Sequence, residues 1–149
     1  MNLSPLLAIR SRLKADAALS AYLLDQYGVP GRFVVGQFKP QNIETDYPYF
    51  SFNAQGELRD AADVKRDQAL NIYWAIHRPE TDVADPDLYR GVAEIAAIGD
   101  LIERCLFDQA NPHRGYRIKH EGETYTDFAV NFPFFAAAAT FTIQVPTAY

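Results

Sequence analysis

The sequence predicts an α+β fold, in which a mainly antiparallel β-sheet has two main helical segments packed on one face. Residues 68–77 alternate apolar and polar side chains, a period of two that is typical of a strand with one buried face. Residues 88–106 carry apolar side chains at spacings of three and four, which indicates an amphipathic helix. Aromatic residues form 13% of the chain and gather at 47–52 and 128–141, and such residues favour strands.

The N-terminal segment is expected to form two helices. Ser4 and Pro5 suit the start of the first, because Ser accepts from free amide groups and Pro needs no partner there. Asp16 predicts the N-cap of the second helix, at residues 17–25, and glycines at 28 and 31 end it. The residues expected to face inward are Leu6, Ile9, Leu13, Leu19, Leu23 and Leu24.

Three strands are expected next, at residues 32–38, 47–52 and 68–77. Pro48 has no amide hydrogen to donate, so it should lie at the start of its strand or on a sheet edge. Residues 53–67 are polar and carry charges of both signs, which predicts a long mobile loop between paired strands.

The second half of the chain is expected to contain the long helix and the remaining strands. Asp85 is predicted to cap the helix, with Pro86 in its first turn. Gly99 interrupts the apolar stripe, which predicts close approach to the sheet or to another helix. Further strands are expected at 116–121, 124–130 and 135–145, with a tight turn at 121–123, although the alanines at 136–139 are compatible with helix.

Composition excludes several function classes. The 149 residues are enough for one domain, residues 1–149, with a sizeable core. A net charge of −5 argues against a general nucleic-acid binder, which needs a basic surface. A single cysteine excludes an intrachain disulfide. No apolar run is long enough to span a membrane, and Arg10, Arg12 and Lys14 interrupt the place where a signal sequence would be apolar.

The residues that could carry chemistry have simpler interpretations, so we predict no enzyme and no catalytic, cofactor or metal site. Cys105 lies on the apolar stripe of the long helix and should be buried. The three histidines lack a metal-ligand spacing, so a metal site would have to be assembled wholly by tertiary contacts. These histidines are His77, His113 and His120. The acidic residues Asp82, Asp85 and Asp87 lack the ligand order of a calcium loop.

Several segments, in this order, resemble a known family. They are the helical residues 13–19, the Tyr-Pro-Tyr-Phe start of a strand at 47–50, the strand containing Trp74, the helix at 88–106 and the closing strand at 141–145. Together they resemble the tail terminator, or tail completion, proteins of long-tailed bacteriophages. The resemblance implies a small α+β domain that forms a homohexameric ring, ends polymerisation of the tail tube and provides the head-docking interface.

The same resemblance implies the partners and the location. The partners are other copies of the chain, the tail tube protein and a head-completion or connector protein, with DNA passing through the bore without specific binding. The protein would belong to the tail or neck of the virion, after assembly in the host cytoplasm. The polar loop is the candidate for partner binding, unless it is merely a solvated loop. Its candidate residues are Glu57, Arg59, Asp60, Lys65 and Arg66.

Three alternatives remain open at this point. One is another head–tail joining protein, such as an adaptor, stopper or neck component. Another is a small ligand-binding or enzymatic domain that uses the aromatic face of the sheet as a pocket. The third is a nucleic-acid module that stacks bases on Tyr49 or Phe52.

Overall fold

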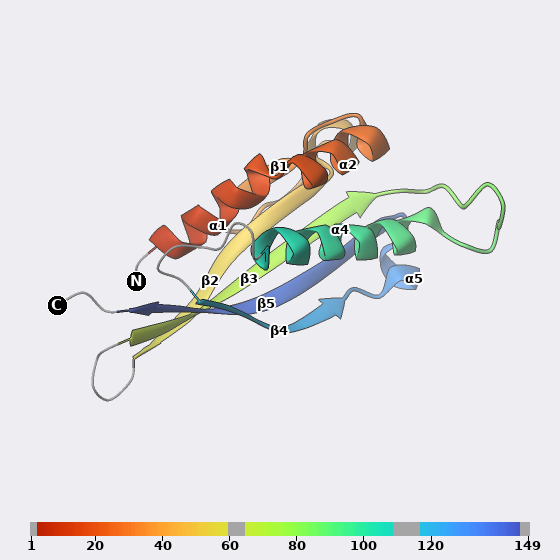
Figure 1. Ribbon diagram of the computed structural model, residues 1–149. Helices are drawn as coiled ribbons and strands as arrows, with labels where there is room; N and C mark the ends of the chain where they lie inside the picture. The colour runs from red at the N-terminus through yellow and green to blue at the C-terminus, as the bar shows by residue number, and fades with distance from the viewer. Residues whose placement is uncertain (1–2, 60–64, 109–116, 147–149) are drawn as a thin grey trace.

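The computed structural model describes residues 3–59, 65–108 and 117–146 (Figure 1). Five helices and five strands lie in these ranges. The helices are α1 (Ser4–Ala15), α2 (Ala17–Tyr27), α3 (Ile43–Asp46), α4 (Arg90–Leu106) and α5 (Phe128–Asn131). The strands are β1 (Arg32–Val35), β2 (Tyr49–Arg59), β3 (Lys65–His77), β4 (Arg117–Tyr125) and β5 (Phe134–Pro146).

The five strands form one sheet in the order β1-β2-β3-β5-β4. Only the β1–β2 pair of this sheet is parallel, and the other three pairs are antiparallel. The long helices α1 and α4 lie side by side over the same face of the sheet, with α2 continuing the layer of α1 (Figure 1). The predicted α+β fold, with a mainly antiparallel sheet and helices on one face, is therefore confirmed.

The main core fills the space between the helices and the sheet. Phe50, Trp74 and Ala137 pair across the three central strands, and all three are buried. The indole nitrogen of Trp74 donates a hydrogen bond to the carbonyl of Ile95 in α4, at 3.1 Å. A Cβ atom on Gly99 would lie 3.2 Å from the Trp74 ring, so the glycine lets α4 approach the sheet as predicted.

The two N-terminal helices begin as predicted. The Asp16 carboxylate accepts a hydrogen bond from the Leu19 amide at 2.9 Å, which caps α2. Gly28 ends α2 with φ of 72°, a conformation that favours glycine. Of the six residues expected inward, Leu24 is the exception, because it is 51% exposed on the outer side of α2.

The start of the long helix was predicted wrongly. It begins at Arg90, and neither Asp85 nor another side chain caps it. The Asp85 carboxylate instead accepts from the Asp87 amide at 3.1 Å, while Asp82 accepts from the amides of residues 84 and 85. Such local side-chain bonds compete with helix formation, so the segment forms turns, and Leu88 remains exposed.

The prediction of a long loop at residues 53–67 was also wrong. β2 continues to Arg59 and β3 begins at Lys65, so most of this segment is paired strand. The pairing is supported from the other side as well, because β3 pairs with β5 from Lys65 onward. The backbone of β3 is thus hydrogen-bonded on both edges, to β2 and to β5, and this pairing outweighs the weak strand propensity of the polar side chains. Residues 60–64 lie outside the described residues.

The region after α4 differs from the prediction in two ways. β4 is one continuous strand across the expected turn, with an irregularity in the register between His120 and Gly122. Residues 128–131 form α5 rather than strand, because the Asp127 carboxylate accepts from the amides of Ala129 and Val130. The alanines at 136–139 lie in β5, as the prediction of a closing strand required.

The connection between β1 and β2 crosses the face opposite the long helices. β1 ends at Val35, earlier than expected. Phe38 and Tyr47 pack there against Tyr49. The connection includes α3, which the sequence analysis did not predict. Asp46 secures it by accepting from two backbone amides of the connection, at 2.8 and 2.9 Å, and from the guanidinium of Arg32 at 2.8 Å.

Candidate assembly interface

Four of the five predicted partner-binding residues lie in the strands of the β2–β3 hairpin. Glu57 and Arg59 belong to β2, whereas Lys65 and Arg66 belong to β3. The register makes Arg59 and Arg66 direct cross-strand partners and pairs Glu57 with Gln68. Asp60 lies outside the described residues. The backbone therefore brings the two arginine positions together at the far end of the hairpin, which extends beyond the helices in Figure 1.

The sheet face opposite the long helices carries an aromatic cluster at one end, which we call the tyrosine cluster. It consists of Phe38, Tyr47, Tyr49, Tyr73 and Phe134. Neighbouring rings lie 5.0–5.9 Å apart, and Tyr49 at the centre is buried. Burial raises the pKa of Tyr49, with the nearby Tyr73 adding to the effect. The cluster is therefore a neutral, partly apolar surface with hydroxyl groups able to hydrogen-bond.

Two shallow grooves border the tyrosine cluster. They have volumes of about 360 and 270 Å³ and share Tyr49 and Tyr73. Tyr49 is only 6% exposed and Phe52 is fully buried under the helices, so neither ring can stack on a base as the nucleic-acid alternative required. That alternative was wrong about both residues. The grooves leave the ligand-binding alternative untested.

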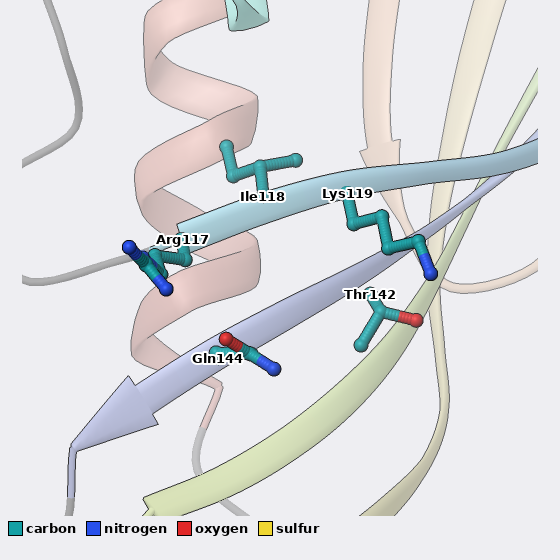
Figure 2. A pocket seen from close by; sticks show the side chains of 5 residues that line it. All are labelled: Arg117, Ile118, Lys119, Thr142 and Gln144. Carbon is teal, nitrogen blue, oxygen red and sulfur yellow. The ribbon is translucent and has the colours of Figure 1, made fainter.

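A third groove, of about 300 Å³, lies on β4 and β5 (Figure 2). Arg117 lies beside Gln144, and Lys119 lies beside Thr142, in agreement with the strand register. The Lys119 side chain is 77% exposed and reaches Glu121 at 3.8 Å, a contact of little energetic weight at this exposure. The groove therefore presents two cationic side chains at the outer strand of the sheet, where they can bind acidic groups.

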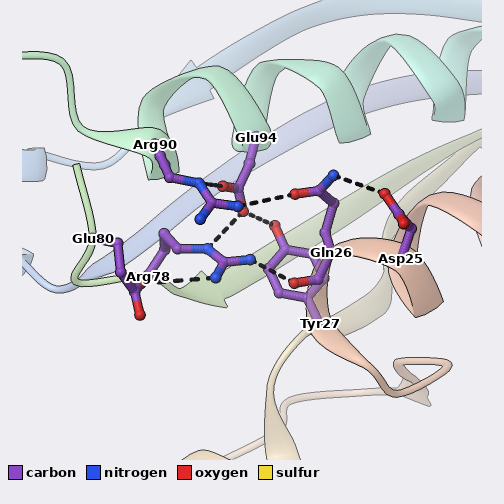
Figure 3. A network of polar contacts seen from close by, with 7 residues as sticks. All are labelled: Asp25, Gln26, Tyr27, Arg78, Glu80, Arg90 and Glu94. Carbon is purple, nitrogen blue, oxygen red and sulfur yellow. Dashed lines mark hydrogen bonds and ion pairs between the residues drawn. The ribbon is translucent and has the colours of Figure 1, made fainter. Parts of the chain in front are cut away.

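A buried polar network joins α2, β3 and α4 (Figure 3). Glu94 is its centre, accepting from the Tyr27 hydroxyl at 2.8 Å and from the Arg78 guanidinium at 2.9 Å. Arg90 forms an ion pair with the second Glu94 oxygen at 3.3 Å, and Arg78 also donates to the Gln26 carbonyl. Burial, helped by the bond to Glu94, raises the pKa of Tyr27. The network fixes the end of the sheet from which the loop 78–89 projects.

Exposed apolar side chains gather near the start of α4. The rings of Tyr89 and Phe132 lie 5.1 Å apart in a tilted arrangement, and both side chains are nearly half exposed. Val92 in α4 is also exposed, as is Val130 in α5. Val83 is fully exposed in the loop that precedes the helix, among the acidic residues of that loop. Apolar groups of this kind, when they gather on one side of a protein, are typical of contact surfaces.

The one cysteine is a structural residue, as predicted. Cys105 is 6% exposed, and its thiol donates to the Arg12 carbonyl at 3.7 Å. Burial raises the pKa of this thiol to about 11, which keeps it protonated and weakly nucleophilic at neutral pH. The position therefore contributes packing between α1 and α4. None of the described helices combines the length and the apolar character needed to cross a membrane.

The fold is similar to that of solved structures. A chain of the structure described as "Virion of native gene transfer agent (GTA) particle" aligns with a TM-score of 0.54. The alignment covers 95% of this chain and 94% of that chain, at 16% sequence identity. The fold resembles that of a chain in a virion. No family model matches the sequence, and no curated protein matches it either.

Proposed function

We propose that this protein is a structural component of a phage-like virion, in which it forms a ring that caps the tail tube. The ring would end tube polymerisation and provide the surface to which the head docks. The observation that carries the proposal is the fold shared with a virion chain over almost the whole length of both chains. The order of segments that resembles the tail terminator family supports the same function from the sequence.

The surfaces described above suit a subunit of a closed ring. Such a ring needs two different surfaces on each subunit, because each copy contacts its neighbours head to tail. The protein offers the β2–β3 hairpin and the β4–β5 groove near one end of the sheet, and the loop 78–89 with its exposed apolar neighbours near the other (Figure 1). Surfaces at opposite ends allow a copy to bind two neighbours at once.

The β4 edge favours contacts of this kind over uncontrolled strand pairing. β4 is the outermost strand on its side of the sheet. It carries exposed Arg117 and Lys119 and a register irregularity at Gly122, and both features discourage edge-to-edge pairing. Assembly would therefore depend on side-chain contacts, in which Glu57, Arg59, Asp60, Lys65 and Arg66 are the candidates on the hairpin.

Size-exclusion chromatography with light scattering tests the proposal directly. The protein should form a ring-sized oligomer either alone or when mixed with the tube protein from the same genome, and electron microscopy should show the ring at the tube end. Arg59→Glu together with Arg66→Glu should weaken this association, whereas Lys39→Glu, outside the hairpin, should not. A monomer in both conditions, with no effect on tube length, would refute the proposal.

The same preparation separates the tail terminator function from the adaptor or stopper function. Pull-down against the tube protein and against the portal protein gives the answer. Binding to the tube end is expected for a terminator, and binding to the portal alone would indicate a protein on the head side of the joint. Turnover of a small molecule would favour the enzymatic alternative.

A further inference from the structure

Two carboxylates flank a histidine where side chains of α4 and β4 meet. His120 and Glu123 come from β4, and Glu103 comes from α4. One ligand atom of each lies within 4.8 Å of the others. The spacing along the sequence gives no hint of this cluster, because the helix contributes one member and the strand irregularity at Gly122 sets the spacing of the other two.

The two ring nitrogens of His120 have different surroundings. Nδ1 lies 2.9 Å from a Glu103 oxygen, which is hydrogen-bond distance. Nε2 lies 4.0 Å from Glu123 Oε1, too far for a hydrogen bond, and this buried nitrogen has no hydrogen-bond partner. The carboxylate on Nδ1 favours the tautomer with the proton there. Nε2 is then left with a free lone pair, at 4.0 Å from the second carboxylate.

This arrangement matches the way proteins prepare a histidine for a metal ion. A metal-binding histidine commonly donates its other ring N–H to a carboxylate, which orients the ring and makes the ligand more basic. Glu103 occupies that position here. Glu123 is oriented as well, because its second oxygen accepts from the Tyr125 hydroxyl at 2.7 Å.

We propose that His120 Nε2 and Glu123 Oε1 bind a divalent transition-metal ion such as Zn²⁺. Tetrahedral coordination at about 2.1 Å from each atom would place the two atoms about 3.4 Å apart, so the carboxylate must approach by about 0.6 Å. Gly99 lies beside this carboxylate, since a Cβ added there would be 3.5 Å from Glu123 Oε1. The two ligand side chains are about one quarter exposed, although the Nε2 atom itself is buried.

The proposal does not depend on the proposed function, but it gives the edge strand a second link to the helix layer. The Glu103 contact already joins β4 to α4 through His120. A metal ion bound at Nε2 would hold the irregular part of β4 in place, next to Phe141, whose ring lies 5.1 Å from the His120 ring.

The single tryptophan provides a reporter. Trp74 and Glu123 both lie close to Gly99. A Cβ added to Gly99 would be 3.2 Å from the Trp74 ring and 3.5 Å from Glu123 Oε1. Co²⁺ quenches indole fluorescence at such short range, whereas Zn²⁺ does not. Titration of tag-free protein with Co²⁺ should therefore quench Trp74 with one ion per chain, and excess Zn²⁺ should restore the signal.

Three variants decide the assignment. His120→Gln should abolish the quenching, and Glu103→Gln should weaken Co²⁺ binding about 10- to 100-fold through the loss of ring orientation. His77→Gln, at the other end of the sheet, is the matched control and should bind as the wild type does. Circular dichroism of each variant checks folding. Absence of quenching in the wild type, or equal quenching in His120→Gln, would overturn the proposal.

Discussion

Replacing Glu94 with alanine should destabilise the protein more than removing any exposed charge. The Glu94 side chain is 7% exposed and accepts from Tyr27 and from Arg78, whose side chain is 13% exposed. Without Glu94, the Arg78 charge and the Tyr27 hydroxyl remain buried without their partner. Breaking a buried ion pair by removing one member costs about 3–5 kcal/mol. This is a large part of the roughly 5–15 kcal/mol that stabilises a typical domain.

Glu80 provides a matched control on the same arginine. It lies 3.7 Å from Arg78, but its side chain is 54% exposed. Exposed ion pairs contribute about 0–1 kcal/mol, so Glu80→Ala should lower the free energy of unfolding by less than about 1 kcal/mol. Both substitutions remove a carboxylate from the Arg78 guanidinium, but Glu94→Ala also removes the partner of Tyr27 and Arg90, so the comparison contrasts the buried network with one exposed ion pair.

Urea denaturation followed by Trp74 fluorescence measures both effects. The midpoint should fall much further for Glu94→Ala than for Glu80→Ala, at an unchanged slope. Measurements at two protein concentrations separate folding from assembly, because an oligomer adds a concentration-dependent contribution. Equal losses for the two variants would refute the reasoning and show that the network contributes no more than a surface contact.

Three further predictions follow from the same structure. Two backbone amides and then an arginine lower the pKa of Asp46, so its contribution to stability is complete above pH of about 3.9 and is lost as the pH falls through the lower folded value. Between pH 5 and pH 2, the urea midpoint should therefore fall less for Asp46→Asn than for the wild type. An equal fall of the midpoint in both proteins would contradict this. Gly91→Ala would place a Cβ 2.2 Å from the Phe135 ring and should cost about 1–3 kcal/mol, whereas Gly99→Ala, at 3.2 Å from its neighbour, should cost less in the same assay. Cys105 should react with a disulfide reagent at pH 8 only at the rate of unfolding, because burial raises the thiol pKa, and fast labelling of the folded protein would argue against it.

Periodic patterns predicted the buried elements well. The alternation at Leu70, Ile72, Trp74 and Ile76 identified the central strand, and all four residues are buried. The apolar stripe of α4 was likewise read correctly from Ile95 onward. Burial on one face imposes a period on the sequence, so elements of this kind can be recognised without the structure.

Boundaries and irregular segments could not be predicted in the same way. Asp85 suits a helix cap by residue type, but its carboxylate bonds a nearby turn instead. Residues 53–59 are polar and nevertheless form strand, because the pairing partner β3 is held by β5 from another part of the chain. Gly122 was interpreted as a turn and lies at a strand irregularity. For the strand the deciding contact is non-local, whereas for Asp85 two local arrangements compete and residue type does not say which one wins.

The candidate functional residues were even harder to predict from the sequence than the boundaries of the helices and strands. The five candidate residues were chosen for charge, and among those described the register supports only the closeness of Arg59 and Arg66. The cluster around His120 could not be found from spacing, because Glu103 lies on a different element. Chemistry that is assembled by packing requires the fold to be known first.

The position of β5 has a consequence for how the protein is made. This strand lies between β3 and β4 but follows both in the chain, so a ribosome delivers two strands whose shared neighbour does not yet exist. Until Phe134–Pro146 emerges, one edge of β3 stays open and β4 has no place in the sheet. Folding thus waits for contacts between distant residues, which slows it and exposes the nascent chain to aggregation. Chains that stop short of β5 should be substrates for chaperones or proteases.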